Sequence, residues 1–330
     1  MGSTHLSVLL VLFWGGPLWA QDDRQTEKTD DRRSFWVDLL FAEPLENPEE
    51  LWMDLASVDV LYLGETHRLE RHHRLHEEII REMGKTDRPL LIGMEQIEAK
   101  DQPAVDRFNA GELSFEELAE AISWKEQWRN YPDYRGIVEA AQEFGARLVG
   151  INAPRQLIRE VGQQGVAALP PEKRSQLPER LHLDDPTYEK LMDKLLSVHS
   201  TFDPKFLRNV FEAQAARDDS FAHHFVVAMN QMPKKKGAGR PLGILIAGSG
   251  HLQFGLGTPD RVRWREPNWE SRILLFSESG DLVLTPMEKA MRRAIQIHHR
   301  ELRYIQRPVA DYLHVREWNP NADRDVPDTP

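Results

Sequence analysis

Two short apolar stretches of the sequence end in the same pattern, Gly-x-x-His. Residues 61–67 read LYLGETH, and residues 244–251 read ILIAGSGH. The first pattern supplies Glu65 and His67, and the second supplies His251. Imidazole and carboxylate groups are ligands for divalent metal ions, and they are also common general acids and bases. The repeated pattern therefore marks two places, far apart in the sequence, that could take part in chemistry.

Two more apolar stretches end in polar residues. Residues 88–95 end at Glu95, and residues 146–152 end at Asn152. Because ligands of open α/β sheets bind beyond the carboxyl ends of the strands, we expect these side chains and the two histidines to share one rim. The residues predicted to hold a divalent metal ion are His67, His251, Glu65 and Glu95. The alternative is that the rim residues only form hydrogen bonds that cap loops.

Three more histidines follow the first pattern, on a predicted helix at residues 68–83. His72, His73 and His76 fall on the apolar stripe of that helix, and the first and last of them are four positions apart. Side chains at that spacing can face the same ligand. We expect at least one of the three to face a ligand, although a single core histidine is usually inert.

A long helix is predicted at residues 205–231. Its apolar stripe includes Gln214 and Asp218, four positions apart. A buried carboxylate is costly unless it has a partner. One interpretation is that Asp218, with Gln214 and Asn152, orients the rim residues from behind. The other is that it binds a backbone amide and has a purely structural role.

Residues 124–134, WKEQWRNYPDY, hold two tryptophans, two tyrosines and Lys125. Such a density of aromatic side chains suits a flat apolar ligand. Composition alone favours the simpler alternative, in which the segment packs onto the core.

The order of these stretches predicts an α/β fold. Apolar strand candidates alternate with helical segments, which is typical of a mostly parallel central sheet covered by helices. The strands are uniformly apolar, as expected when helices cover both faces. We also predict a final hairpin at residues 272–284, a helical insertion at 162–204, and a tail at 286–330 that is helical and then disordered.

Composition limits the class of protein. The chain has 330 residues, a formal net charge of −11 and no cysteine. A net negative charge disfavours binding to nucleic acid, which requires a basic face. The absence of cysteine excludes disulfides, thiolate metal sites and a lipid anchor on cysteine.

The N-terminal residues 1–20 predict a secretory signal peptide. They contain no charged residue, and residues 6–14 form an apolar run too short to span a bilayer comfortably. We expect cleavage after Ala20, a charged and disordered leader at 21–49, and a soluble protein exported to a bacterial periplasm. No later stretch is apolar and long enough to span a membrane. The alternative is an uncleaved anchor.

Six motifs carry a resemblance to a known family. They are GETHRLERHHRLHEEII, GMEQ, WRNYPDYRGIVEAA, LVGINAP, EAQAARDDSFA and GSGHLQFGLGTPDR, in that order. The chain resembles the haem-binding uptake ChaN-like domain of the wider Tiki-type group, over residues 50–285. The resemblance implies an exported haem- or iron-binding protein of bacterial iron acquisition rather than an enzyme. It also implies a homodimer, because haem of the ChaN type lies between two subunits.

The same resemblance suggests candidate haem residues. A tyrosine supplies the axial ligand in the ChaN type and basic groups meet the propionates, which makes the candidates Tyr131, Tyr134, His73 and Lys125. Tiki-type relatives offer an alternative of a different class, a metal-dependent hydrolase acting on peptide bonds. In that case His67 and His251 would hold the metal ion, and Glu65 or Glu95 would be a third ligand or the catalytic base.

Overall fold

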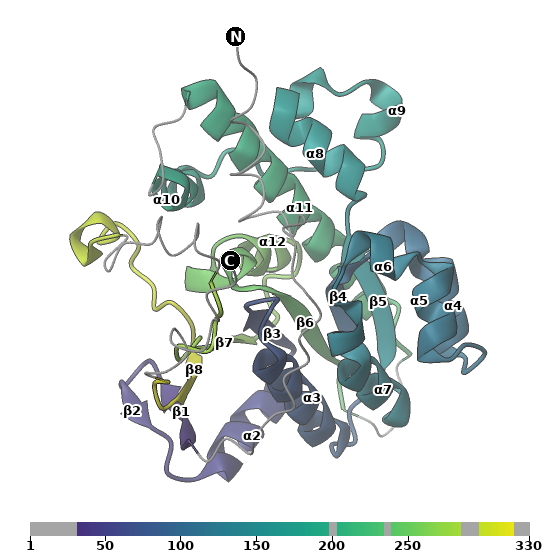
Figure 1. The fold of residues 1–330 in the computed structure, drawn as a ribbon, viewed down its shortest axis with the longest axis vertical. Coiled ribbons are helices and arrows are strands. Elements are labelled where there is room, and N and C mark those ends of the chain that lie inside the picture. Colours follow the sequence, from purple (N-terminus) through teal and green to yellow (C-terminus); the bar gives the residue numbers. More distant parts are fainter. Residues whose placement is uncertain (1–31, 198–202, 234–238, 285–296, 320–330) are drawn as a thin grey trace, which may run out of the picture.

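A computed structural model describes residues 32–197, 203–233, 239–284 and 297–319. Within them the strands form one eight-stranded sheet in the order β2-β1-β8-β7-β3-β6-β4-β5 (Figure 1). The strands are β1 (Ser34–Asp38), β2 (Glu43–Pro44), β3 (Val60–Glu65), β4 (Leu90–Glu98), β5 (Arg147–Asn152), β6 (Leu242–Gly248), β7 (Ser271–Phe276) and β8 (Tyr312–Arg316).

The sheet is mostly parallel, as the sequence predicts. Strands β3 to β8 pair in parallel, whereas β1 pairs antiparallel with both β8 and β2. Every residue of β3, β4 and β6 is buried, as expected from their apolar runs, and the burial includes the polar residues at the carboxyl ends of β3 and β4. The α/β fold class is confirmed.

Helices cover both faces of the sheet (Figure 1). Helices α3 and α7 pack with Leu61 and Leu63 of β3 on one face, and α11 and α12 pack with Val60 and Tyr62 on the other. The helices are α2 (Pro48–Ser57), α3 (Glu70–Gly84), α4 (Gln102–Asn109), α5 (Phe115–Ala121), α6 (Trp124–Gln127), α7 (Arg135–Glu143), α8 (Arg155–Gln164), α9 (Pro171–Arg174), α10 (Pro186–Ser197), α11 (Pro204–Asn230) and α12 (Thr258–Arg265).

The two predicted helices that carry polar residues on their apolar stripes are present. In α3 the three histidines are buried along with Ile79, Ile80 and Met83. Helix α11 begins directly after Asp203, whose side chain caps it by accepting hydrogen bonds from backbone N–H groups of the first turn. Pro204 occupies the first helical position, where proline is favoured. The segment 162–204 contains α9 and α10, and its residues 198–202 lie outside the described residues.

The leader and the tail differ from the sequence-based expectation. Residues 34–38 of the leader form β1 instead of disordered chain, and residues 312–316 of the tail form β8 instead of helix or coil. The prediction of a hairpin at 272–284 was correct for its first strand, β7, and wrong for its second. The neighbours of β7 in the sheet are β3 and β8, not a strand that follows it directly. The physical reason is burial: Trp36 is buried against the rings of Phe276 and His314, and this contact exists only after folding.

Other predictions concern regions that the structure does not describe. The signal peptide at residues 1–20, the first part of the leader at 21–31, and residues 285–296 and 320–330 lie outside the described ranges. Within those ranges, no helix combines the length and the apolar character needed to cross a bilayer.

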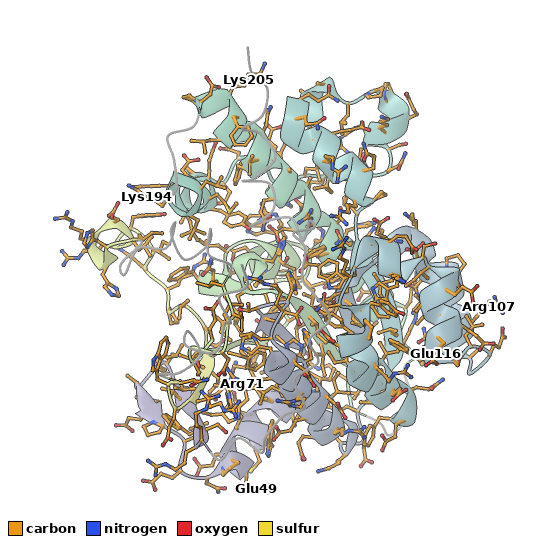
Figure 2. The ribbon with its side chains drawn as sticks, viewed as in Figure 1. Glu49, Arg71, Arg107, Glu116, Lys194 and Lys205 are labelled. Carbon is orange, nitrogen blue, oxygen red and sulfur yellow. The ribbon has the colours of Figure 1, made fainter. Side chains whose placement is uncertain are left out.

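A buried arginine ties α3 to the end of the sheet. Arg71, labelled in Figure 2, lies 3.2 Å from His314 Nδ1 and 3.4 Å from His72 Nε2, and it donates to the Ser277 carbonyl. Burial and the neighbouring Arg71 guanidinium lower the pKa of His72 to about 4 and that of His314 to about 3. Both histidines are therefore neutral in the folded protein near neutral pH.

Acid should destabilise the fold through this pair. The unfolded chain binds protons on both histidines near pH 6.5, whereas the folded chain binds them only near pH 4 and below, so stability is complete above pH 6.5 and falls as the pH drops towards 4. Each unit of pKa difference corresponds to about 1.4 kcal/mol. Thermal unfolding followed by circular dichroism at pH 7.5, 6 and 5 measures this loss.

The His314→Gln variant should lose less stability than the wild type between pH 7.5 and 5, because one titrating group is removed. Gln can still accept from Arg71. The exposed His299 gives a matched control, since His299→Gln should leave the pH dependence unchanged. Equal pH dependence in all three proteins would contradict the assignment.

Candidate functional site at the Gly-x-x-His rim

The two Gly-x-x-His patterns lie side by side at the carboxyl ends of β3 and β6. These strands are paired in parallel, with Gly64 opposite Ala247 and Glu65 opposite Gly248. A Cβ atom on Gly248 would lie 2.9 Å from His67 Nε2, and one on Gly64 would lie 3.2 Å from Ser249 Oγ. Each glycine therefore leaves room for a residue of the other pattern. The shared rim predicted from the sequence is present.

Glu65 is the most connected group of the rim. Its Oε1 atom accepts hydrogen bonds from the Tyr134 hydroxyl at 2.5 Å and from Gln96 Nε2 at 2.9 Å. His67 Nδ1 lies 2.6 Å from the same oxygen. The carboxylate is buried, so these polar partners compensate for the water it has lost.

The second oxygen of Glu65 faces two buried histidines. Oε2 lies 3.5 Å from His73 Nε2 and 3.4 Å from His76 Nδ1. None of these atoms has a hydrogen-bond partner among the described residues. Burial raises the pKa of Glu65, but His73, His67 and His76 together outweigh it and lower that pKa. Burial lowers the pKa of His76 to about 3, so this ring is neutral beside an ionised carboxylate.

His67 is the rim histidine that reaches the surface. Its side chain is 30% exposed, and the ring meets Trp128 edge-on at 4.9 Å. Nε2 lies 3.9 Å from Glu95 Oε2, which is too far for a hydrogen bond. Burial lowers the pKa of His67, but the carboxylates of Glu95 and Glu65 outweigh it and raise the pKa.

Glu95 lies between the two rim histidines. Its Oε1 atom is 3.6 Å from His251 Nε2, and its Oε2 atom accepts from the Gly248 N–H at 2.8 Å. Burial raises the pKa of Glu95, while the histidines and Arg217 outweigh it and lower the pKa. Asn152 holds this strand end in place by donating to the Glu95 carbonyl at 2.8 Å.

The other side of His251 is held by α11. Its Nδ1 atom lies 2.8 Å from Asp218 Oδ1 and 3.0 Å from Gln214 Nε2. Asp218 also accepts from the Thr258 hydroxyl at 2.7 Å and the Tyr188 hydroxyl at 2.8 Å. The sequence of the long helix suggested that Asp218 orients a rim histidine. This contact is present, and it fixes the orientation of the His251 ring.

The four predicted metal residues converge without forming a metal cage. Across the parts of the chain that the structure describes, no group of three or more His, Cys, Asp or Glu side chains is arranged to hold a metal ion. Donor atoms are already engaged, because Glu65 Oε1 has three polar partners and Glu95 Oε2 binds a backbone N–H. The divalent metal site at His67, His251, Glu65 and Glu95 therefore stays a prediction.

The predicted haem residues have different environments. Tyr134 is fully buried with its hydroxyl on Glu65, and His73 is buried beside it, with the two rings 4.4 Å apart. Burial and Glu65 raise the pKa of Tyr134 well above its usual value, which disfavours a tyrosinate there. Tyr131 is half-buried and stacks on Phe115 at 6.1 Å, whereas Lys125 is exposed.

The aromatic segment both packs on the core and supports the rim. Trp124 is fully buried, and its Nε1 donates to the Gln96 carbonyl at 2.8 Å. Asn130 donates to the His67 carbonyl at 2.6 Å. Packing, the simpler interpretation of this segment, is therefore correct, and it also fixes two backbone positions of the rim.

Sequence reasoning missed several residues of this site. Tyr188 and Thr258 reach Asp218 from α10 and from the start of α12, and no local pattern marked either of them. Arg217 did leave a signal, since it stands next to Asp218 in an alanine-rich stretch of α11 and is buried. Trp128 lay inside the aromatic segment but was not singled out as the contact of His67.

Comparison with known proteins finds a family model that matches the sequence and solved structures with a similar fold. The family model described as haem-binding uptake, Tiki superfamily, ChaN matches residues 51–262. The structure is similar to that of ChaN of Campylobacter jejuni solved with cofacial haem, with a TM-score of 0.62 and 16% identity over 86% of this chain and 97% of that chain. No protein of curated function matches the sequence significantly.

Other solved structures are similar to this one at lower TM-scores. The toxin effector domain RRSP from Vibrio vulnificus has a TM-score of 0.41 and 15% identity over 72% of this chain and 37% of that chain. The family match over residues 51–262 identifies an α/β protein of the Tiki superfamily. Within it, the chain belongs to the haem-binding uptake ChaN family.

The glycine of the second pattern should control the position of His67. In Gly248→Ala the new Cβ pushes the imidazole away from Glu65 and Glu95, so the pKa of His67 should fall towards the ordinary value near 6.5. Histidine titration by NMR measures the change. Gly250→Ala is a matched control, because a Cβ there meets nothing within 4 Å and should leave His67 unchanged. An unaltered His67 in Gly248→Ala would contradict the close packing.

The bond between Tyr134 and Glu65 should contribute to stability. A buried hydrogen bond to a charged group is worth about 1.5–3 kcal/mol, so Tyr134→Phe should lower the free energy of unfolding by about that amount. Urea unfolding measures it. In Glu65→Gln, the same tyrosine substitution should cost less, and equal costs in both backgrounds would show that the bond is not coupled to the charge.

Proposed function

We propose that the protein binds haem against the aromatic residues beside the Gly-x-x-His rim. Family membership over residues 51–262 carries this proposal. The fold likeness to a ChaN solved with haem supports it, since 97% of that chain is covered. The proposal concerns binding and uptake of haem, not turnover.

The residues around His67 and the aromatic segment have side chains that could hold haem. Trp128 and Tyr131 are partly exposed and are backed by the buried rings of Phe115, Trp124 and Tyr134, and a porphyrin needs such an apolar wall. His67 has its Nδ1 fixed by Glu65 while its Nε2 makes no hydrogen bond, which is how ligating histidines are usually oriented. Haem bound there would supply a ferric iron that a side chain of the site could ligate.

Tyr131 is the residue proposed to ligate the haem iron. It is half-buried at the edge of the aromatic cluster, whereas Tyr134 is enclosed and its hydroxyl is committed to Glu65. Lys125, which is exposed on the same segment, is the proposed partner of a propionate. His73 is too deeply buried to serve that role without a rearrangement of α3.

The cellular setting is proposed from the sequence. A cleavable signal peptide at residues 1–20, no cysteine for a lipid anchor and membership of an uptake family are consistent with a soluble periplasmic protein of iron acquisition. A homodimer with haem between its subunits is proposed on the same basis. Light scattering of residues 21–330 with and without haem measures the assembly.

Absorbance titration with ferric haem tests the binding and the ligand. Wild-type protein should give a saturable Soret shift at about one haem per chain, with the spectrum of a tyrosinate-bound ferric iron. Tyr131→Phe should lose that spectrum because the ligand oxygen is removed. The folding of each variant is checked by circular dichroism.

Tyr134→Phe is the matched control, since it removes the same atom from a tyrosine that lies inside the protein. It should be less stable but retain the tyrosinate spectrum. Loss of the spectrum in Tyr134→Phe with retention in Tyr131→Phe would reverse the assignment. Loss in His67→Ala alone would move the ligand to the histidine.

A metal-dependent hydrolase is the other outcome of the same experiment. The comparisons do not favour it, although His67, Glu95 and His251 lie together at the rim. No Soret shift, together with stoichiometric zinc or manganese in the purified protein, would contradict haem binding and favour hydrolysis.

A further inference from the structure

A second candidate binding site lies on the other face of the sheet. A cavity of about 260 Å³ has Tyr62 of β3 and Ile273 of β7 as its floor, and these residues are paired in register. Helix α12 forms one wall, through Val262 and Arg263 among others, and residues 307–311 contribute to the other. Side chains alternate along β3, so Tyr62 faces away from Leu63 and Glu65. The cavity is therefore separate from the rim.

The hydroxyl of Tyr62 lacks a partner. The side chain is 1% exposed and lines the cavity, yet its hydroxyl makes no hydrogen bond with any residue in the described ranges. Burial raises the pKa of Tyr62, so the group stays protonated and can donate. The hydroxyl oxygen is not one of the fully enclosed polar atoms without a partner, so it reaches the space of the cavity and has room there for a hydrogen-bond partner. An acceptor inside the cavity would supply one.

The charged groups of the cavity are already paired. Arg263 and Arg307 both contact Asp260, the second of them at 2.9 Å from each oxygen. Glu266 accepts from an asparagine side chain at 2.7 Å, and Asp311 accepts from a backbone N–H at 2.7 Å. Each charged group of the lining thus already has a hydrogen-bond partner within the protein, which disfavours a charged ligand.

Aromatic residues shape the cavity. Phe254 and Trp269 belong to its lining, and Phe254 has a left-handed backbone with φ of 61°. A residue other than glycine is strained in that conformation, and such strain is frequent at ligand sites. Phe254 is held there by its N–H, which donates to the Val309 carbonyl at 2.7 Å. An apolar cavity of about 150 Å³ holds benzene, so the larger space here suits a fused two-ring molecule.

We propose that this cavity binds an uncharged, planar aromatic molecule of one or two rings whose single acceptor atom receives a hydrogen bond from Tyr62. The rings would lie over Ile273 and Val262, beside Phe254 and Trp269. The site does not depend on haem, because the rim lies on the opposite side of β3.

The test compares two probes of nearly equal shape. 1-Indanone has a carbonyl acceptor, and indane lacks it. Each is titrated into residues 21–330 without haem, and binding is followed by protein-observed NMR. Wild-type protein should bind 1-indanone about 2- to 10-fold more tightly than indane, the range expected for one net hydrogen bond. Shifts should be confined to amides around the cavity.

Tyr62→Phe should remove that preference and leave the affinity for indane unchanged. Tyr312→Phe is the matched control, since its hydroxyl donates to Asp54 at 2.9 Å and it does not line the cavity. Equal affinity of the wild-type protein for the two probes, or no saturable binding of either, would overturn the proposal. These wild-type results require no variant to fold, and they are independent of the haem titration.

Discussion

The arrangement of the rim depends on one buried charge, the carboxylate of Glu65. A buried ion is stable only when polar groups replace the water it has lost. Here the replacements come from four parts of the chain: the turn after β3, the end of β4, the segment 131–134, and α3. Compensating that charge therefore fixes these elements relative to one another, which explains why α3 carries histidines on its buried face.

The neighbouring carboxylate, Glu95, has a different environment. It lies between two histidines, and one of them is locked by Asp218 on α11 while the other remains partly exposed. The rim thus has a rigid inner side and one accessible ring, His67, next to the aromatic segment. This asymmetry suits a site that receives a ligand from the surface, as the proposed haem binding needs.

The ends of the chain complete the sheet. Strand β8 lies between β1 and β7, so residues near both termini share one set of hydrogen bonds with the parallel core. Arg71 of α3 reaches the same region and contacts His314 of β8. The strands at the sheet edge and the helix beside the rim are consequently coupled through a buried cation and two neutral histidines.

The sequence by itself determined the parallel core, the buried histidine helix and the meeting of the two Gly-x-x-His patterns, because apolar runs, helical periodicity and strand-end glycines are local signals. It could not determine that β1 and β8 join the sheet, that Tyr134 is enclosed while Tyr131 is partly exposed, or that the rim carboxylates are engaged by other partners. Those outcomes depend on contacts between residues far apart in the chain. Burial and hydrogen-bond partners are set only when the layers pack, so only the tertiary structure decided them.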